Sequence, residues 1–130
     1  MKSRAIRILA CGLFCLAALR SGHTQHLNEA DSPCAKAVIT SEVSACLVDA
    51  YKSSDAILNT VYGKVRAKLD AGELKQLTKT QELWIRYRDT NCAAERDLYG
   101  SGTGAFPAYE ACLGAMTRAR TAELHVTYAV

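Results

Sequence analysis

The side chains with the most defined chemistry in this sequence are four cysteines in its later part, Cys34, Cys46, Cys92 and Cys112. An even number of cysteines in a small exported chain is typical of a disulfide framework. Four thiolates could instead hold zinc, but zinc sites use close ligand pairs such as Cys-x-x-Cys, and no such spacing occurs here. We therefore predict two disulfides and no metal site.

Four cysteines can pair in three ways, and their positions favour one of them. Cys34 and Cys46 flank the start of a first predicted helix, while Cys92 and Cys112 flank a glycine-rich loop where two helices must meet. Pairing Cys92 with Cys46 fits less well, because a helical hairpin would offset them by about 7.5 Å. Disulfides usually join Cα atoms about 5.5–6 Å apart. We predict the pairs Cys34–Cys46 and Cys92–Cys112.

Motifs of the common enzyme classes are absent from the sequence: it contains no GxSxG, HExxH, P-loop or HRD pattern. Three carboxylates, Asp89, Glu95 and Asp97, lie close together in sequence. Asp89 and Glu95 are six residues apart, which places them on different faces of a helix and argues against an acid/base pair. Oxidised cysteines cannot act as nucleophiles. We expect no catalytic residue and no cofactor, so the protein is predicted not to be an enzyme.

Residues 1–20 have the features of a secretory signal peptide. Three cations precede a run of 12 uncharged, mostly apolar residues, Ile8–Leu19. This run is shorter than the about 20 residues that a transmembrane helix needs, so we expect no membrane span. The cleavage position stays open. A lipid anchor would require acylation of Cys11 or Cys15, whose surroundings suit it poorly, so a periplasmic or secreted protein is favoured.

The charge of the chain depends on this leader. The whole sequence has 16 Lys and Arg against 13 Asp and Glu, a formal net charge of +3. Four of the cations and none of the acids lie in residues 1–20, so the remainder has a net charge of −1. A basic domain would have indicated nucleic-acid binding, and this balance does not. We expect no nucleic-acid partner.

Apolar residues recur at helical spacing in three segments of a chain long enough for one domain. The first runs from about Ser41 and is predicted to close at Gly72, the second spans about 73–98, and the third starts near Pro107. No extended strand pattern occurs. The predicted fold class is therefore all-α, a small disulfide-stapled bundle of three main helices. The polar residues 21–33 are expected to form a flexible tail.

The short turn at Asp70–Glu73 predicts that the first two helices form a long antiparallel hairpin. If the hairpin is symmetric, Asp55 on one helix faces Arg88 on the other. These residues lie on the inward faces and carry opposite charges. We predict a partly buried Asp55–Arg88 ion pair.

The cysteines combine with other residues into a longer pattern. Its segments are Asp55-x-x-Leu58-Asn59-x-x-Tyr62, Gln81-x-x-Trp84-Ile85-x-Tyr87-Arg88-Asp89-x-x-Cys92, a glycine-rich loop, and Cys112-Leu113-x-x-x-Thr117-x-x-Arg120-Thr121-x-Glu123-Leu124. In this combination the chain resembles the LprI-like lysozyme-inhibitor family of small exported bacterial helical domains. The resemblance covers residues 34–124 and implies an LprI-like helical domain over 34–130. Founding members of the family include lipoproteins, from which this sequence departs.

Two groups of residues are candidates for a role. Six motif residues are expected to form a buried polar network that fixes the register of the helices: Asp55, Asn59, Gln81, Trp84, Arg88 and Arg120. The loop Arg96–Pro107 is expected to bind a partner, because binding residues favour loops on rigid scaffolds. Its candidate residues are Arg96, Tyr99, Ser101, Thr103 and Phe106.

The resemblance implies a protein target, and the family name implies that the target is a lysozyme. The first hypothesis is an exported inhibitor that binds and blocks a lysozyme-type muramidase, with Arg96 or the loop hydroxyls placed against the two carboxylates that glycoside hydrolysis uses. The alternative is a periplasmic protein-interaction module, such as an immunity or envelope assembly factor, without lysozyme activity or inhibition.

Overall fold

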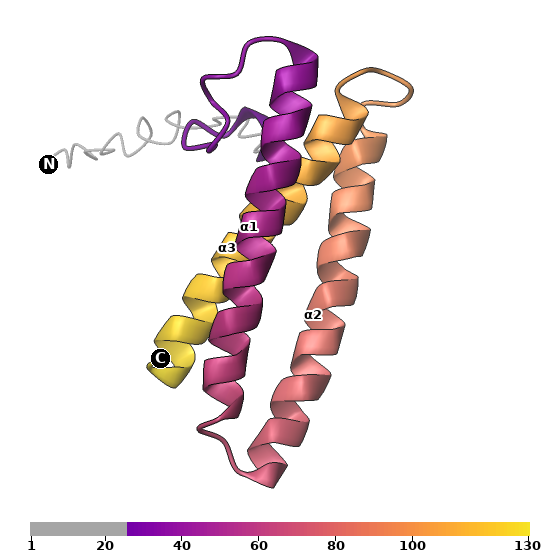
Figure 1. The fold of residues 1–130 in the computed structure, drawn as a ribbon. Coiled ribbons are helices and arrows are strands. Elements are labelled where there is room, and N and C mark those ends of the chain that lie inside the picture. Colours follow the sequence, from indigo (N-terminus) through magenta and orange to yellow (C-terminus); the bar gives the residue numbers. More distant parts are fainter. Residues whose placement is uncertain (1–25) are drawn as a thin grey trace, which may run out of the picture.

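The computed structural model describes residues 26–130, and within them the chain forms helices and no strand. In chain order the elements are η1 (His26–Asn28), α1 (Thr40–Arg66), α2 (Ala71–Asp97) and α3 (Ala105–Tyr128). Figure 1 shows α1 and α2 running antiparallel, with α3 lying along both. The predicted all-α bundle of three main helices is confirmed. None of the helices in this part of the chain carries an apolar stretch sufficient to span a bilayer.

Helix α3 holds the bundle together, because it packs against both α1 and α2. Its inward face includes small residues, Ala108, Ala111 and Gly114, that let the neighbouring helices approach closely. A Cβ atom built on Gly114 would lie 3.7 Å from the Cα atom of Tyr51 in α1. Helix α3 is therefore the central element, although it comes last in the sequence.

The largest cluster of buried apolar side chains lies toward the α1–α2 turn. It joins all three helices and consists of Leu58, Val61, Val65, Leu77 and Leu124. Each of these side chains is at most 3% exposed. Full burial of a Leu or Val side chain contributes about 1.5–3 kcal/mol, so this cluster is a main source of the stability of the bundle.

The first helix ends earlier than the sequence predicted. Helix α1 ends at Arg66, and Gly72, which was expected to close it, lies in the first turn of α2. A capping box explains the difference: Asp70 Oδ1 accepts a hydrogen bond from the Glu73 backbone N–H at 2.9 Å, and Glu73 Oε2 accepts from the Asp70 N–H at 3.0 Å. Two donors that would otherwise lack partners are satisfied, which starts α2 before the glycine.

The predicted tail, residues 21–33, is described from His26 onward. There the segment folds back on the bundle. Both the backbone N–H and the Nδ1 atom of His26 contact the carboxylate of Glu95, at 2.7 and 2.6 Å. Leu27 packs against the cluster that contains Cys34 and Leu47. These contacts anchor the segment that leads into α1. The predicted signal peptide, residues 1–20, lies outside the described residues.

Candidate functional site

Both disulfides lie at one end of the bundle. Cys34 pairs with Cys46 at a Cα separation of 5.9 Å, and Cys92 pairs with Cys112 at 5.4 Å, as the sequence predicted. The first bond ties the segment before α1 to the second turn of that helix, and the second joins the last part of α2 to α3. We call this end, formed by residues 26–46 and 92–112, the disulfide end. Its irregular segments are held by covalent bonds at their bases.

A cavity of about 280 Å³ opens at the disulfide end. It lies between the segment around α1's start and the connection from α2 to α3, and its lining residues are Leu27, Asn28, Val38, Thr40, Val43, Thr103, Gly104 and Pro107. Small-molecule sites usually start near 300 Å³. A cavity of this size suits one or two side chains of a protein partner.

Four large apolar side chains are exposed around this end. Val38 and Ile39 precede α1, while Leu98 and Phe106 flank the connection between α2 and α3. Their exposed fractions run from 53% for Phe106 to 88% for Val38. Apolar side chains that gather on a surface beside polar groups mark interaction sites in soluble proteins. We call these four residues the apolar rim: Val38, Ile39, Leu98 and Phe106. The periodicity of the sequence does not distinguish them from core residues.

The predicted binding loop is shorter than Arg96–Pro107. Arg96 belongs to the last turn of α2, and α3 already begins at Ala105, so Phe106 is helical. The third helix starts before Pro107 because the first turn of a helix does not use its backbone N–H groups, and proline is tolerated there. Ser101 and Thr103 do lie in the irregular connection and are exposed. Thr103 also lines the cavity.

Arg96 is held by neighbouring side chains, and the ring of Tyr99 packs over a glycine. The Arg96 guanidinium forms an ion pair with Asp97 at 2.8 Å and lies over the Tyr109 ring, 5.7 Å from its centroid. The Tyr99 ring covers Gly104 so closely that a Cβ atom there would lie 2.6 Å from it. Only glycine fits at this position without moving the ring. The conformation of the connection is therefore set by its own packing.

The six residues predicted as a buried polar network come together in the structure, but only Gln81, Arg88 and Arg120 are buried. Arg120 Nε donates to Gln81 Oε1 at 3.0 Å, in a buried contact. The indole of Trp84 has Arg120 at 5.8 Å and Arg88 at 5.2 Å from its ring centroid. Asn59 Nδ2 donates to Asp55 Oδ2 at 3.0 Å on the exposed side of α1. The network thus runs from solvent at Asn59 to the interior at Gln81.

The predicted Asp55–Arg88 ion pair is present but long, with 3.9 Å between Oδ1 and Nη1. The nearer carboxylate is that of Asp89, at 2.8 Å from Arg88 Nη2. Arg88 also donates to Thr117 Oγ1 at 3.4 Å and lies over the Tyr51 ring. The register predicted from the sequence paired the correct two helices. It did not predict the contacts of Arg88 with its neighbour Asp89 or with Thr117 of α3, because it considered only α1 and α2.

The carboxylates considered for catalysis each have a partner in the structure. Asp89 pairs with Arg88, Asp97 pairs with Arg96, and Glu95 contacts His26. One possible metal-binding group also includes Glu95: donor atoms of His26, Glu95 and Cys112 lie within 4.8 Å of one another. The Cys112 sulfur is bonded to Cys92, however, and only a free thiolate is a strong metal ligand. This group therefore does not form a metal site while the disulfide is intact.

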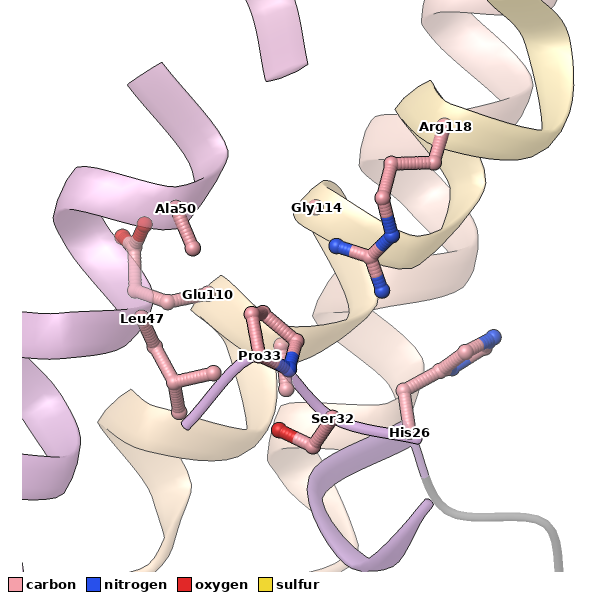
Figure 2. Close-up of a pocket in the computed structure, with 9 residues that line it drawn as sticks. His26, Ser32, Pro33, Leu47, Ala50, Glu110, Gly114 and Arg118 are labelled. Carbon is pink, nitrogen blue, oxygen red and sulfur yellow. The ribbon is translucent and has the colours of Figure 1, made fainter. Parts of the chain in front are cut away.

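A second, much smaller cavity of about 10 Å³ lies where the N-terminal segment crosses α3. Figure 2 shows Glu110 beside Leu47 and Ala50, and Arg118 reaching past Gly114 into the same region. The volume is that of a single water molecule. Burial raises the pKa of Glu110 above its ordinary value of 4.5, and the charge of Lys52 partly opposes this effect.

Because the pKa of Glu110 is raised, we predict that this residue lowers the free energy of unfolding at neutral pH. The folded state holds the Glu110 proton more tightly than the unfolded state, so stability falls as the pH rises above about 4.5 toward the raised value. We expect Glu110→Gln to be more stable than the parent at pH 7 by less than about 1 kcal/mol, because solvent screens this half-buried group. At pH 4 the difference should be smaller. Urea unfolding at both pH values measures it.

Glu82→Gln is the matched control for that measurement, because it makes the same exchange at an exposed position of α2. A Glu110→Gln protein that is less stable than the parent at pH 7 would contradict the expectation. An equal gain in the control would show that the effect does not depend on burial at Glu110.

Comparison with known proteins gives the family. Residues 30–124 match the family described as lysozyme inhibitor LprI. The uncharacterized protein R02472 of Rhizobium meliloti (strain 1021) is 32% identical to this chain, across 75% of the chain and 79% of its own length. No solved structure matches the chain. The resemblance predicted from the cysteine and Trp-Ile-x-Tyr-Arg-Asp motifs is thereby confirmed: this protein is a member of the LprI lysozyme-inhibitor family.

Proposed function

We propose that the protein is an exported inhibitor that binds a lysozyme-type muramidase and blocks it, and that it binds through the disulfide end. The observation that carries the proposal is the exposed apolar rim at the disulfide end, where Val38 also lines the 280 Å³ cavity and where both disulfides lie. A preorganised surface loses little conformational entropy when it binds, so more of its contact energy becomes affinity. The family supports a lysozyme as the target.

The distribution of charge supports the same surface. In the half of the bundle with the disulfides, residues 26–53 and 85–116, there are eight carboxylates and five cations. In the other half, residues 54–84 and 117–130, there are five carboxylates and seven cations. An enzyme that acts on an anionic cell-wall polymer gains from a positively charged surface, which an acidic inhibitor surface complements. The net charge of the whole domain conceals this segregation.

The proposed block acts on the substrate cleft of the enzyme. Glycoside hydrolysis requires two carboxylates that flank the scissile bond. Phe106 and Leu98 would cover the apolar wall of such a cleft, while the half-exposed Arg96 guanidinium, one of the cations at this end, would approach the acidic pair. The four cysteines require an oxidising compartment, which supports a periplasmic or secreted location for the protein.

Phe106→Ala tests the surface directly. We expect the oxidised parent protein to slow lysis of bacterial cell walls by a lysozyme, and Phe106→Ala to raise the inhibition constant by at least about 10-fold, as removal of a central aromatic anchor does. Tyr87→Ala is the matched control, since Tyr87 is a 61% exposed aromatic residue on α2 outside residues 92–112 of the disulfide end. Turbidity of a cell-wall suspension, followed over a range of inhibitor concentrations, gives both constants.

Two results would count against the proposal. Lysis that continues unchanged at a saturating concentration of folded, oxidised protein would contradict inhibition itself. Inhibition that is weakened equally by Phe106→Ala and Tyr87→Ala would leave inhibition intact and reject the disulfide end as its surface.

A further inference from the structure

The end of the bundle opposite the disulfides is basic. The connection from α1 to α2 and the turns that flank it carry five cations, Lys64, Arg66, Lys68, Lys75 and Lys79, all at exposed positions. Only two carboxylates, Asp70 and Glu73, lie within the same residues 64–79, so their net charge is +3. We call these five cations the basic tip. Figure 1 shows that the α1–α2 turn projects beyond the end of α3.

Only some of these five cations are stabilised by interactions within the bundle. Lys64 and Arg66 lie in the last turn of α1, where cations are stabilised by the helix dipole. Lys68 Nζ donates to the Ala129 carbonyl at 2.9 Å. Lys75 and Lys79 lie beyond the first turn of α2, one turn apart on the same face, and neither has an ion-pair partner among residues 26–130. The two acids of this region accept hydrogen bonds within the capping box.

We propose that the basic tip binds the surface of an anionic phospholipid membrane. Each Lys or Arg near such a surface gains about 1 kcal/mol, so clustered cations bind where a single one does not. An exposed apolar side chain accompanies them: Val126 is 85% exposed, one turn before Ala129, whose carbonyl accepts from Lys68. At a membrane surface, buried apolar area adds to the electrostatic attraction between cations and anionic lipids. Because the α1–α2 turn projects beyond α3, its cations can approach a planar membrane surface without obstruction from the rest of the bundle.

The charge of the other half fixes the orientation. Because the disulfide half has eight carboxylates against five cations, an anionic surface repels it while attracting the basic tip. Helix α1 has 27 residues, which gives a length of about 40 Å. The bound protein would stand on the basic tip and hold the apolar rim away from the lipid. This inference does not depend on which protein the disulfide end binds.

Binding to lipid vesicles tests the proposal. Protein produced from the complete chain is mixed with vesicles of phosphatidylcholine, or with vesicles that contain roughly equal parts of phosphatidylglycerol and phosphatidylcholine. We expect sedimentation with the anionic vesicles only. Raising NaCl from about 0.05 to 0.5 M should release the protein, because the interaction is between exposed charges. A triple variant, Lys64→Gln with Lys75→Gln and Lys79→Gln, should bind roughly 100-fold more weakly.

The matched control removes three exposed cations outside the tip, Lys36→Gln, Lys52→Gln and Arg86→Gln, and should retain binding. Circular dichroism establishes that both triple variants keep the helical content of the parent. Equal losses in the two triple variants would overturn the proposal, because net charge alone would then decide. Binding to the neutral vesicles, or no binding to the anionic ones at low salt, would overturn it too. Salt-sensitive association of the protein with itself, in the absence of vesicles, would assign the tip to the acidic end of a second copy.

Discussion

Arg120→Leu is expected to lower the free energy of unfolding by about 3 kcal/mol, since it leaves a buried polar partner unsatisfied. The Arg120 side chain is 6% exposed, donates to Gln81 at 3.0 Å and lies over Trp84. Leucine keeps apolar volume at the site but cannot donate to the Gln81 oxygen. That buried oxygen then loses its hydrogen bond without gaining water. Urea unfolding of the parent and the variant, followed by far-ultraviolet circular dichroism, measures the difference.

Two further variants separate the buried contact from the exposed one. Glu123 pairs with the same guanidinium at 2.7 Å, but its side chain is 60% exposed, so Glu123→Gln should cost less than about 1 kcal/mol. Combining Arg120→Leu with Gln81→Leu removes both buried partners and should recover part of the loss, because apolar groups of similar shape can replace a buried polar pair. A double variant less stable than either single one would contradict this interpretation.

Replacing Cys92 and Cys112 together by alanine is expected to have the other large effect, a loss of about 3–5 kcal/mol in the free energy of unfolding. The bond closes a loop with a sequence separation of 20, for which the chain-entropy estimate is about 3 kcal/mol. Both cysteines are completely buried, so the missing sulfur atoms also leave space in the core. The Sδ atom of Met116 lies 3.7 and 3.8 Å from the two sulfurs and would lose these contacts.

The double replacement of Cys34 and Cys46 is the comparison for this experiment. Its sequence separation is 12, Cys46 is only half-buried, and the bond lies at the margin of the bundle. We expect a loss of about 3 kcal/mol or less. Chemical denaturation of both double variants under the same conditions shows which of the two disulfides contributes more to the free energy of unfolding. The expectation fails if the Cys34–Cys46 variant is the less stable of the two.

The fold could be predicted from the sequence because its signals are local. Apolar residues at helical spacing, an even number of cysteines and the Trp-Ile-x-Tyr-Arg-Asp pattern located the helices and the disulfide pairs. Helix ends were less predictable, because they depend on competition between signals. At the α1–α2 turn the capping box of Asp70 and Glu73 prevails over the preference of Gly72 for a helix end. At the start of α3, Pro107 occupies the third helical position rather than the first.

The candidate site could be predicted only in part. The composition of the loop indicated Ser101 and Thr103, which are exposed at the disulfide end. The cavity could not be foreseen, because Leu27 and Thr103 line it together and are far apart in the chain. Val38 and Ile39 look like core residues in sequence, and only the packing of α1 reveals that they are exposed. The segregation of charge is similarly hidden, because a net charge averages over both ends.

The placement of both covalent bonds at one end has a consequence for how the molecule moves. Among the described residues no crosslink lies near residues 64–79, so the buried apolar cluster that includes Val65 and Leu77 is what holds this end closed during local fluctuations. At the opposite end the Cys92–Cys112 bond keeps α2 joined to α3, and the Cys34–Cys46 bond keeps the preceding segment joined to α1, whatever the rest of the bundle does. Partial unfolding of the uncrosslinked end would therefore leave these covalent connections at the disulfide end in place.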